Sequence, residues 1–506
     1  MFKKLTEKLA KNRFLLKPFL ILCLIYLLGF SAIILAGVHY ADDAARTTYG
    51  YDGWSFFSRY LSTALSHGLH ADSYLTNIAP LPQIIAVGCL AASSLALICV
   101  VSGKELFLKP WTKWMPSIIA ATLLGFCPYF FECMSYQYDA PYMALSMLFA
   151  IVPFLFRHGE RKRYLAAVAI GILGACMTYQ VSIGIFLVLL IFLAMKDWAD
   201  GKDGKEILKF VLWSAGSALL ALLVFQKCLM TTEDVYVSNE MPAISVFMAE
   251  FLKHLGQYCG LIGEDAKVLW LILAGLMGVG FVILFVLGSK RNKILASLIA
   301  AVGLFCMAMA AYTPYSMLTE PLYAARAMYA IGAVIAILGI YTASRAANFK
   351  RGWQKLVAVP AMVLAWCFFV FAFTYGNALK EQDTYRNMQI TMVTSDLNEL
   401  LPKIDGKNVA VQVSGQIDYS PVIRNMPEDT RRALHRLLKS SFGRNTAWMA
   451  YRVTEGPWLM DVTRRADENL TERNLPVLRD TALYKIRGDQ DNILVEFKGE
   501  EFDVSF

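Results

Sequence analysis

Long hydrophobic segments, separated by short polar stretches, occupy the first three quarters of the chain. A helix that crosses a bilayer needs about 20 mostly apolar residues, and most of these segments approach that length. The predicted spans are residues 15–38, 81–101, 115–131, 140–156, 164–178, 181–195, 210–227, 268–288, 294–312, 327–343 and 356–375. The fifth and sixth are short and meet at residues 178–180, so a re-entrant hairpin is the alternative to two full spans.

Two of the longer connections have the pattern of helices that lie in a membrane interface. In the connection 39–80, apolar side chains recur at helical spacing over residues 53–67. The connection 228–267 repeats this pattern with Ile244, Phe247, Met248, Phe251 and Leu255 on one side. Because one face is apolar and the other polar, we expect amphipathic interfacial helices here.

The pattern changes after residue 376, where the chain becomes polar. Residues 408–413 alternate like a strand, and residues 427–438 begin with proline and acids and end with basic residues, as helices do. Residues 482–486 and 493–497 predict a hairpin. We therefore expect two parts: a transmembrane domain, residues 1–375, and a small α/β domain, residues 376–506, which we expect to shape the acceptor side of any site.

Composition and charge agree with a membrane protein and give it an orientation. The chain has 506 residues, of which 57% are hydrophobic and 17% charged, with a formal net charge of +8. A soluble domain cannot bury so much apolar surface. The predicted outer loops before residue 376 hold only six basic residues: Arg46, Arg59, Lys227, Lys253, Lys267 and Arg326. The positive-inside rule then puts the N-terminus in the cytoplasm and the C-terminus outside. The positive charge suits anionic lipid, so we expect no nucleic-acid partner.

The predicted spans carry no charged residue near their middle, and the inner loops carry no glycine-rich phosphate loop. Ionisable groups inside a membrane usually mark ion or proton pathways. Their absence from these predicted spans argues against an ion-coupled transporter, and the inner loops argue against a cytoplasmic nucleotide site.

Acids and arginines are placed just beyond the spans on the outer side. Asp42 and Asp43 directly follow the first span, with Arg46 one helical turn later, and Arg326 precedes the tenth span. The outer loop 132–140 adds Glu132, Tyr136, Gln137 and Asp139. Carboxylates serve as general bases or as cation ligands, and arginine binds phosphate oxygens bidentately. The same residues also fit a solvated helix start and an interfacial anchor, so both interpretations stay open.

The wording of the first outer loop carries a family resemblance. Tyr-Ala-Asp-Asp-Ala-Ala-Arg at residues 40–46, followed by Gly53, Trp54 and Arg59, is similar to the O-antigen glucosyltransferase (Gtr) family. An acidic pair directly after an N-inside first span, a long first outer loop and a trailing outer domain look like the GT-C class of glycosyltransferases. The resemblance covers about residues 1–375 and implies transfer of glucose from undecaprenyl phosphate glucose to a surface glycan, outside the bacterial inner membrane.

The resemblance implies roles for particular residues. An acid in the first outer loop is the catalytic base in GT-C enzymes, which here corresponds to Asp42 or Asp43, with Asp42 favoured. By position and chemistry, Arg326, Arg59 and Arg46 are the candidate ligands of the donor phosphate. The candidate substrate-binding residues are Tyr51, Trp54, Glu132, Tyr136, Gln137 and Asp139. Two adjacent carboxylates can also hold a divalent cation such as Mg²⁺ or Mn²⁺, so Asp42 and Asp43 are a candidate metal site.

Three other functions compete with this interpretation. A GT-C enzyme for another sugar or another lipid acceptor is the nearest. A lipid-carrier transporter or flippase would call for broken helices or polar groups near the membrane midplane. A glycan polymerase or ligase also has many spans and a long outer loop, but it does not need an acidic pair directly after the first span.

Overall fold

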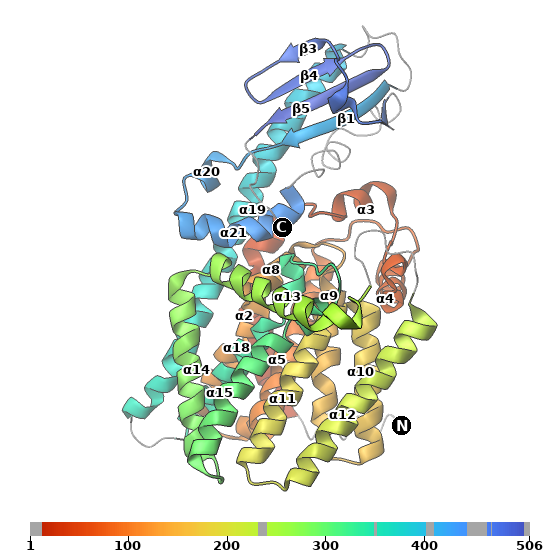
Figure 1. Cartoon of the computed structure of the whole chain (residues 1–506). Helices are drawn as coiled ribbons and strands as arrows, with labels where there is room; N and C mark the ends of the chain where they lie inside the picture. The colour runs from red at the N-terminus through yellow and green to blue at the C-terminus, as the bar shows by residue number, and fades with distance from the viewer. Residues whose placement is uncertain are drawn as a thin grey trace.

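The structure is a computed structural model that describes residues 13–230, 240–348, 352–400, 409–442, 463–466 and 468–499. A bundle of helices forms its main body, and a small sheet stands beyond one end of the bundle (Figure 1). Within the predicted outer connection 228–267, residues 231–239 lie outside the described residues.

The hydrophobic segments predicted as spans coincide with helices. Their bounds are α2 (Leu16–Ala36), α5 (Leu81–Ser102), α6 (Trp111–Ala121) with α7 (Leu123–Phe126), α9 (Ala140–Ile151), α10 (Arg161–Thr178), α11 (Ile183–Ala199), α12 (Gly204–Val224), α14 (Val268–Gly288), α15 (Lys293–Ala310), α18 (Ile331–Ala346) and α19 (Val359–Leu400). Among the described residues, seven helices are long and apolar enough to cross a membrane, or eight if one bent pair counts as a span. The protein is therefore a helical membrane protein with several spans.

The bent pair lies in the segment predicted as the third span. Residues 111–126 and α8 (Pro128–Ser135) meet at an angle of 62°. Pro128 lacks a backbone N–H and disfavours the helical conformation at the residue before it, which explains the extended backbone of Cys127. The bend turns α8 back into the body. The segment 132–140, predicted as a polar outer loop, is therefore buried at each of its predicted site residues.

Shorter helices cover the end of the bundle nearer the sheet (Figure 1), which is called the outer end after its predicted orientation. They are α3 (Asp43–Tyr49), α4 (Tyr60–His70), α13 (Ile244–Asp265), α16 (Thr313–Ser316) and α17 (Ala325–Met328). Helix α13 lies across the bundle, roughly perpendicular to its neighbours (Figure 1). The helix predicted in the connection 228–267 is present as α13. Of the one predicted over residues 53–67, α4 forms only from Tyr60 on, since Ser55–Phe57 forms a separate 3-10 turn. Their place in a membrane interface stays a prediction.

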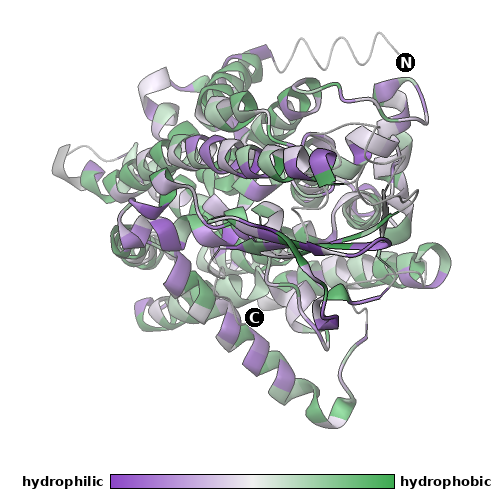
Figure 2. Ribbon diagram, turned by 90° about the horizontal axis from the view of Figure 1, so that it is seen from above, coloured by the Kyte–Doolittle hydropathy of each residue, from purple (hydrophilic) through white to green (hydrophobic). Residues whose placement is uncertain are grey.

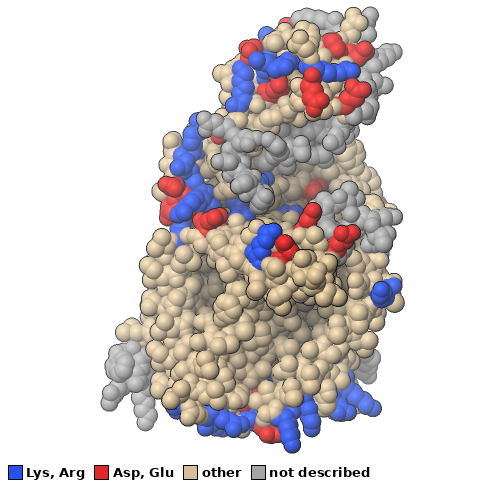
Figure 3. All heavy atoms as spheres, viewed as in Figure 1, with Lys and Arg blue, Asp and Glu red and all other residues tan. Residues whose placement is uncertain are grey.

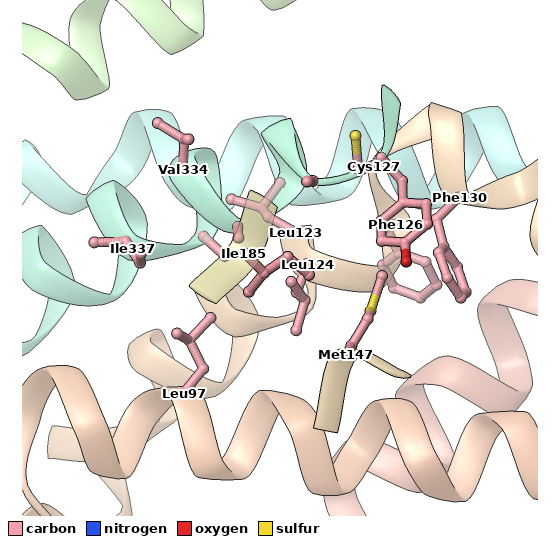
Figure 4. Packing of buried hydrophobic residues seen from close by; sticks show 14 of the residues in the cluster. Leu97, Leu123, Leu124, Phe126, Cys127, Phe130, Met147, Ile185, Val334 and Ile337 are labelled. Carbon is pink, nitrogen blue, oxygen red and sulfur yellow. The ribbon is translucent and has the colours of Figure 1, made fainter. Parts of the chain in front are cut away.

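Apolar side chains pack both inside the bundle and around its outside. Leu97, Leu124, Ile185 and Ile337 come from four different helices and meet in the core, where each is fully buried (Figure 4). Hydrophobic residues also cover outward faces of the peripheral helices (Figure 2); α14, for example, exposes 56% of Val279. Figure 3 shows the consequence on the face in view: an uncharged belt across the middle of the bundle, with Lys and Arg at the end opposite the sheet. A membrane matches that belt.

The predicted strands and helices of the tail are present. Helix α19 runs without a break from the bundle into the tail (Figure 1), so the predicted end of the last span at residue 375 is not a helix end. The sheet has the order β2-β1-β5-β4-β3, with β1 parallel to β2 and β5, and β4 antiparallel to β3 and β5. The strands are β1 (Val409–Gln416), β2 (Thr463–Arg465), β3 (Val477–Asp480), β4 (Tyr484–Gly488) and β5 (Asn492–Lys498).

The segments of the tail belong to two separate hydrophobic cores. The end of α19 packs Ile390, Val393 and Leu397 against the sheet, which has its own core. The helices α20 (Pro421–Arg424) and α21 (Glu428–Phe442) instead contribute side chains such as Leu434 to the core of the main body. Helix α21 is therefore a part of the outer face of the bundle although it belongs to the tail in sequence.

Candidate active site

The two adjacent aspartates have opposite surroundings. Asp42 is exposed, whereas Asp43 is fully buried. Asp43 Oδ2 accepts hydrogen bonds from the backbone N–H groups of Gln137 at 2.8 Å and Tyr40 at 3.3 Å. Its Oδ1 is buried and has no hydrogen-bond partner among the described residues. Burial raises the pKa of Asp43 well above its ordinary value, and the Gln137 N–H opposes this rise. Asp43 thus ties the first outer loop to the segment after α8, and Asp42 is the accessible carboxylate.

Arg46 and Asp139 form a buried ion pair between the first outer loop and the start of α9. The Trp54 indole N–H donates to the same carboxylate, and the guanidinium carbon of Arg46 lies 4.5 Å from the centre of the Trp54 ring. A guanidinium over an indole face adds a cation–π attraction. Arg46 is 3% exposed and Trp54 1%. Both residues therefore hold two loops together, and little of either is accessible to a ligand.

A second ion pair joins the bent helix α8 to α17. Arg326 Nη1 donates to Glu132 Oε1 at 2.5 Å, and the Arg326 backbone N–H donates to Glu132 Oε2 at 2.7 Å. The Glu132 side chain is fully buried, while 16% of the Arg326 side chain is exposed. An unpaired charge in such a place would be strongly unfavourable, so each group depends on the other. The exposed part of Arg326 is at the outer end of the bundle.

Arg59 approaches the same region from the first outer loop. Its guanidinium carbon lies 4.7 Å from the centre of the Tyr179 ring, and its Nε donates to Gln180 Oε1 at 3.4 Å. Burial raises the pKa of Tyr179, and the charges of Arg326 and Arg59 both oppose that rise. Two cationic groups therefore act on one hydroxyl, at the break between α10 and α11. The sequence marked residues 178–180 as a junction of two segments but gave no reason to assign them to the site.

Tyr136 is a buried aromatic residue that contacts the segment just before the acidic pair. Its ring packs edge-on against Tyr40, with the ring centres 5.0 Å apart. Burial raises the pKa of Tyr136; the Arg326 charge lowers it, and Glu132 and Asp42 raise it. The ring contact with Tyr40 and the hydrogen bond from the Gln137 N–H to Asp43 bring residues 136 and 137 against the segment that holds the acidic pair.

Two predicted substrate-binding residues remain, Tyr51 and Gln137. The Tyr51 side chain is accessible, whereas the Gln137 side chain is already hydrogen-bonded within the protein. Tyr51 is 40% exposed, and the Arg46 guanidinium carbon is 6.0 Å from its ring centre. The Gln137 side chain accepts from Asn77 at 2.7 Å and donates to the carbonyl of Val38 at 3.2 Å. Tyr51 is available to stack on a ligand, whereas Gln137 fastens the first loop.

Asp42 and Asp43, the candidate metal site, do not belong to a larger group of metal ligands among the described residues. Over the part of the chain that the structure describes, no group of three His, Cys, Asp or Glu side chains is placed to hold an ion. Asp43 Oδ2 already accepts two N–H groups. His67, which also lies in the first loop, contacts Asp52 Oδ2 at 3.1 Å. We therefore derive no chemical step through a metal.

A large apolar cavity opens beside this charged region. Its volume is about 690 Å³, and its lining along α14 extends from Trp270 to Ile283, which is about 20 Å of helix at 1.5 Å per residue. Helices α15, α18 and α19 complete the apolar walls with residues that include Leu304, Leu338 and Leu364. No single segment contains this cavity, so the sequence pattern gave no indication of it.

The outer end of the cavity is polar. Asp265 Oδ2 accepts hydrogen bonds from Tyr129 Oη at 3.0 Å and from Arg436 Nε at 2.6 Å. The Tyr258 hydroxyl, on a residue that also lines the cavity, is buried and has no partner among the described residues. Tyr129 precedes Glu132 by one turn of α8. Tyr129 of the cavity's polar end and Glu132 of the ion pair therefore lie one turn apart on α8, although neither Glu132 nor Arg326 lines the cavity.

Together these features define a membrane protein that gathers acids and arginines at one end of its helical bundle, next to an apolar cavity. The model of the family described as "Glucosyl transferase GtrII" matches residues 31–337, which include every predicted site residue, and the chain belongs to this family. The resemblance to the Gtr family is thereby confirmed.

One relative adds a weaker similarity. A protein of Salmonella phage P22, described as "Uncharacterized 55.3 kDa protein in gtrB 5'region", is 22% identical over 215 residues. The match covers 42% of this chain and 41% of that protein. No solved structure matches the chain.

Proposed function

We propose that the protein is a GT-C-type glycosyltransferase with eleven spans. The enzyme moves glucose, a hexose, from a polyprenyl phosphate donor such as undecaprenyl phosphate glucose to a hydroxyl of an O-antigen-like surface glycan. The observation that carries the lipid-linked donor is the apolar cavity, whose polar end includes Tyr129, one turn of α8 before the Glu132 that pairs with Arg326. A polyprenyl phosphate needs both: apolar walls for its chain and cationic groups for its phosphate. Membership of the glucosyl transferase family supports the sugar.

In this proposal Asp42 is the general base. It is the accessible member of the acidic pair, and it accepts the proton of the acceptor hydroxyl as that oxygen attacks the anomeric carbon. The bond between this carbon and the phosphate oxygen breaks as the new glycosidic bond forms, so the configuration inverts. Asp43, whose Oδ2 is held by two N–H groups, keeps the loop in place and does not accept the proton.

The leaving group is polyprenyl phosphate, which gains negative charge as the bond breaks. Arg59 lies over the Tyr179 ring and 16% of the Arg326 side chain is exposed, and we assign both arginines to the donor phosphate. Arg46 is excluded from this role in our proposal because it is buried against Trp54 and paired with Asp139. Tyr51 is the side chain we assign to the sugar ring.

The orientation follows from the charge pattern. We place the basic end of the bundle, seen in Figure 3, in the cytoplasm of a bacterial cell and the site with the tail on the periplasmic side of the inner membrane.

The test is direct. Purified protein in detergent or nanodiscs is incubated with a surface glycan and a panel of polyprenyl phosphate sugars, and release of polyprenyl phosphate is measured. We expect release with the glucose donor, and transfer of the sugar to the glycan with inversion. Release with a different sugar would correct the donor; no release with any sugar, from a preparation that binds polyprenyl phosphate, would favour a lipid-carrier transporter.

A further inference from the structure

The tail helix α21 makes direct contact with the two residues that precede the acidic pair. The hydroxyl of Tyr40 donates to the backbone carbonyl of Leu437. The backbone N–H of Ala41 donates to Ser441 Oγ at 3.2 Å. Tyr40, Leu437 and Ser441 are each at most 2% exposed. These hydrogen bonds join segments that lie about 400 residues apart in the chain.

Helix α21 is itself fixed to the main body at Thr430 and at Arg436, which precede these contacts along the helix. Lys267, at the start of α14, donates to Thr430 Oγ1 at 2.5 Å. Arg436 donates to Asp265 at 2.6 Å and, through Nη1, to the carbonyl of Tyr323 at 3.0 Å. These two attachments hold α21 in place relative to the bundle. The residues that Leu437 and Ser441 contact are therefore held in place as well.

The residue that Ser441 holds has an unusual backbone. Ala41 has a φ of +46°, in the left-handed region that L side chains rarely adopt. The next residue is Asp42, and α3 begins directly after it. The conformation of Ala41 therefore sets the direction in which the chain enters α3, and with it the position of the Asp42 carboxylate.

We propose that Ser441 of the tail is a positioning residue for Asp42: its hydroxyl holds Ala41 in the left-handed conformation that presents the catalytic carboxylate. This inference rests on the proposed function. It gives the tail a part in catalysis, in addition to any contact with the acceptor glycan. Ser441 Oγ accepts the hydrogen bond from the Ala41 N–H. When this hydrogen bond is lost, we expect the Asp42 carboxylate to move.

A matched pair of variants tests the proposal. Ser441→Ala removes the hydroxyl, and Ser440→Ala makes the same change one residue earlier on α21, at a half-buried side chain. We expect kcat of Ser441→Ala to fall about threefold to tenfold, the range of one net hydrogen bond, with the donor KM unchanged. Ser440→Ala keeps the wild-type kcat. Titration with donor lipid gives the number of binding sites per protein, which separates slower turnover from a smaller folded fraction.

A second-site variant separates positioning from a general loss of structure. Glycine adopts positive φ without strain. If the hydrogen bond matters because it holds Ala41, the double variant Ala41→Gly with Ser441→Ala recovers most of the lost kcat. The proposal is overturned if Ser441→Ala retains wild-type kcat per donor-binding site, if Ser440→Ala loses as much, or if Ala41→Gly restores nothing. Failure of the proposed function would appear differently, as absence of polyprenyl phosphate release from the wild type.

Discussion

The two ends of the bundle both contain buried ion pairs, yet only one end has the further features of a site. At the basic end, Arg157 Nη2 contacts Asp197 Oδ1 at 2.9 Å, and 9% and 6% of these side chains are exposed. At the other end, Arg326 contacts Glu132 at 2.5 Å, with 16% and 0% exposed. Geometry and burial alone do not distinguish the two pairs.

Their surroundings do distinguish them. Lys202 adds a second cation to Asp197 at 3.0 Å, so that cluster satisfies a carboxylate and joins inner helix ends. Beside Glu132 and Arg326 lie an accessible carboxylate, Asp42, a buried carboxylate oxygen of Asp43 without a partner among the described residues, and the polar end of a cavity. A buried ion pair indicates structure by default. The outer end is a candidate site because it has the accessible carboxylate of Asp42 and a cavity with space for a ligand.

The largest expected effect is at Asp42. Asp42→Asn keeps size and polarity but removes the proton acceptor, so we expect the transfer rate to fall about 10²–10⁴-fold with donor binding retained. Glu206→Gln, a charge removal at an exposed acid of the inner end, serves as the control and keeps the wild-type rate. Initial rates of polyprenyl phosphate release measure both. Wild-type rates in Asp42→Asn would make the outer end as purely structural as the inner one.

The two arginines give the next comparison. Arg326→Ala removes a proposed phosphate ligand and should lower turnover about 100-fold, whereas Arg326→Lys keeps the charge without the bidentate fork and should lose less. Arg157→Ala should destabilise the protein by less than the about 3–5 kcal/mol of an uncompensated buried charge, because Lys202 still contacts Asp197, and turnover per folded molecule should be unchanged. Rates normalised to the monodisperse fraction and thermal melts separate these outcomes. Equal turnover in Arg326→Ala and wild type would remove Arg326 from the site.

Much of this architecture could be predicted from local patterns. The apolar segments, the helices α4 and α13, and the β4–β5 hairpin each depend on periodicity over a few residues, and each is present. The sequence also singled out the acidic pair, because it directly follows a long apolar segment. Whether it is catalytic stays a prediction.

The pairings across the site could not be predicted in this way. Asp139 pairs with Arg46, 93 positions away, and Ser441 holds Ala41, 400 positions away. Such contacts depend on how helices pack, and periodicity carries no information about that. The bend before Pro128 is an intermediate case: proline inside an apolar segment is a readable reason for a break, and the break is what buries Glu132.

The cavity allows a third comparison, between two glycines on apolar helices. Gly275 lines the cavity on α14, and Gly216 lies on α12 outside it; a Cβ at either position meets nothing within 4 Å. Gly275→Leu should displace about two methylene groups of a long polyprenyl chain and raise the donor KM about tenfold, at about 0.8 kcal/mol each. Gly216→Leu should leave the KM unchanged, as should Gly275→Leu assayed with a short-chain donor. If the KM for long and short donors rises alike, the chain does not bind in this cavity.

The smallest expected effect concerns Asp43 and its dependence on pH. Because burial raises its folded pKa above the unfolded value of about 3.9, the folded state binds more protons than the unfolded state between these two values. Stability contributed by the protonated group is therefore present at low pH and is lost as the pH rises towards the folded pKa. Asp43→Asn keeps an acceptor for the Gln137 and Tyr40 N–H groups without the ionisation. We expect the melting temperature of the variant, relative to wild type, to be a few degrees higher at pH 8 than at pH 5. Parallel melting curves across this range would mean that Asp43 stays ionised, and that the outer end tolerates a buried charge as readily as the inner end does.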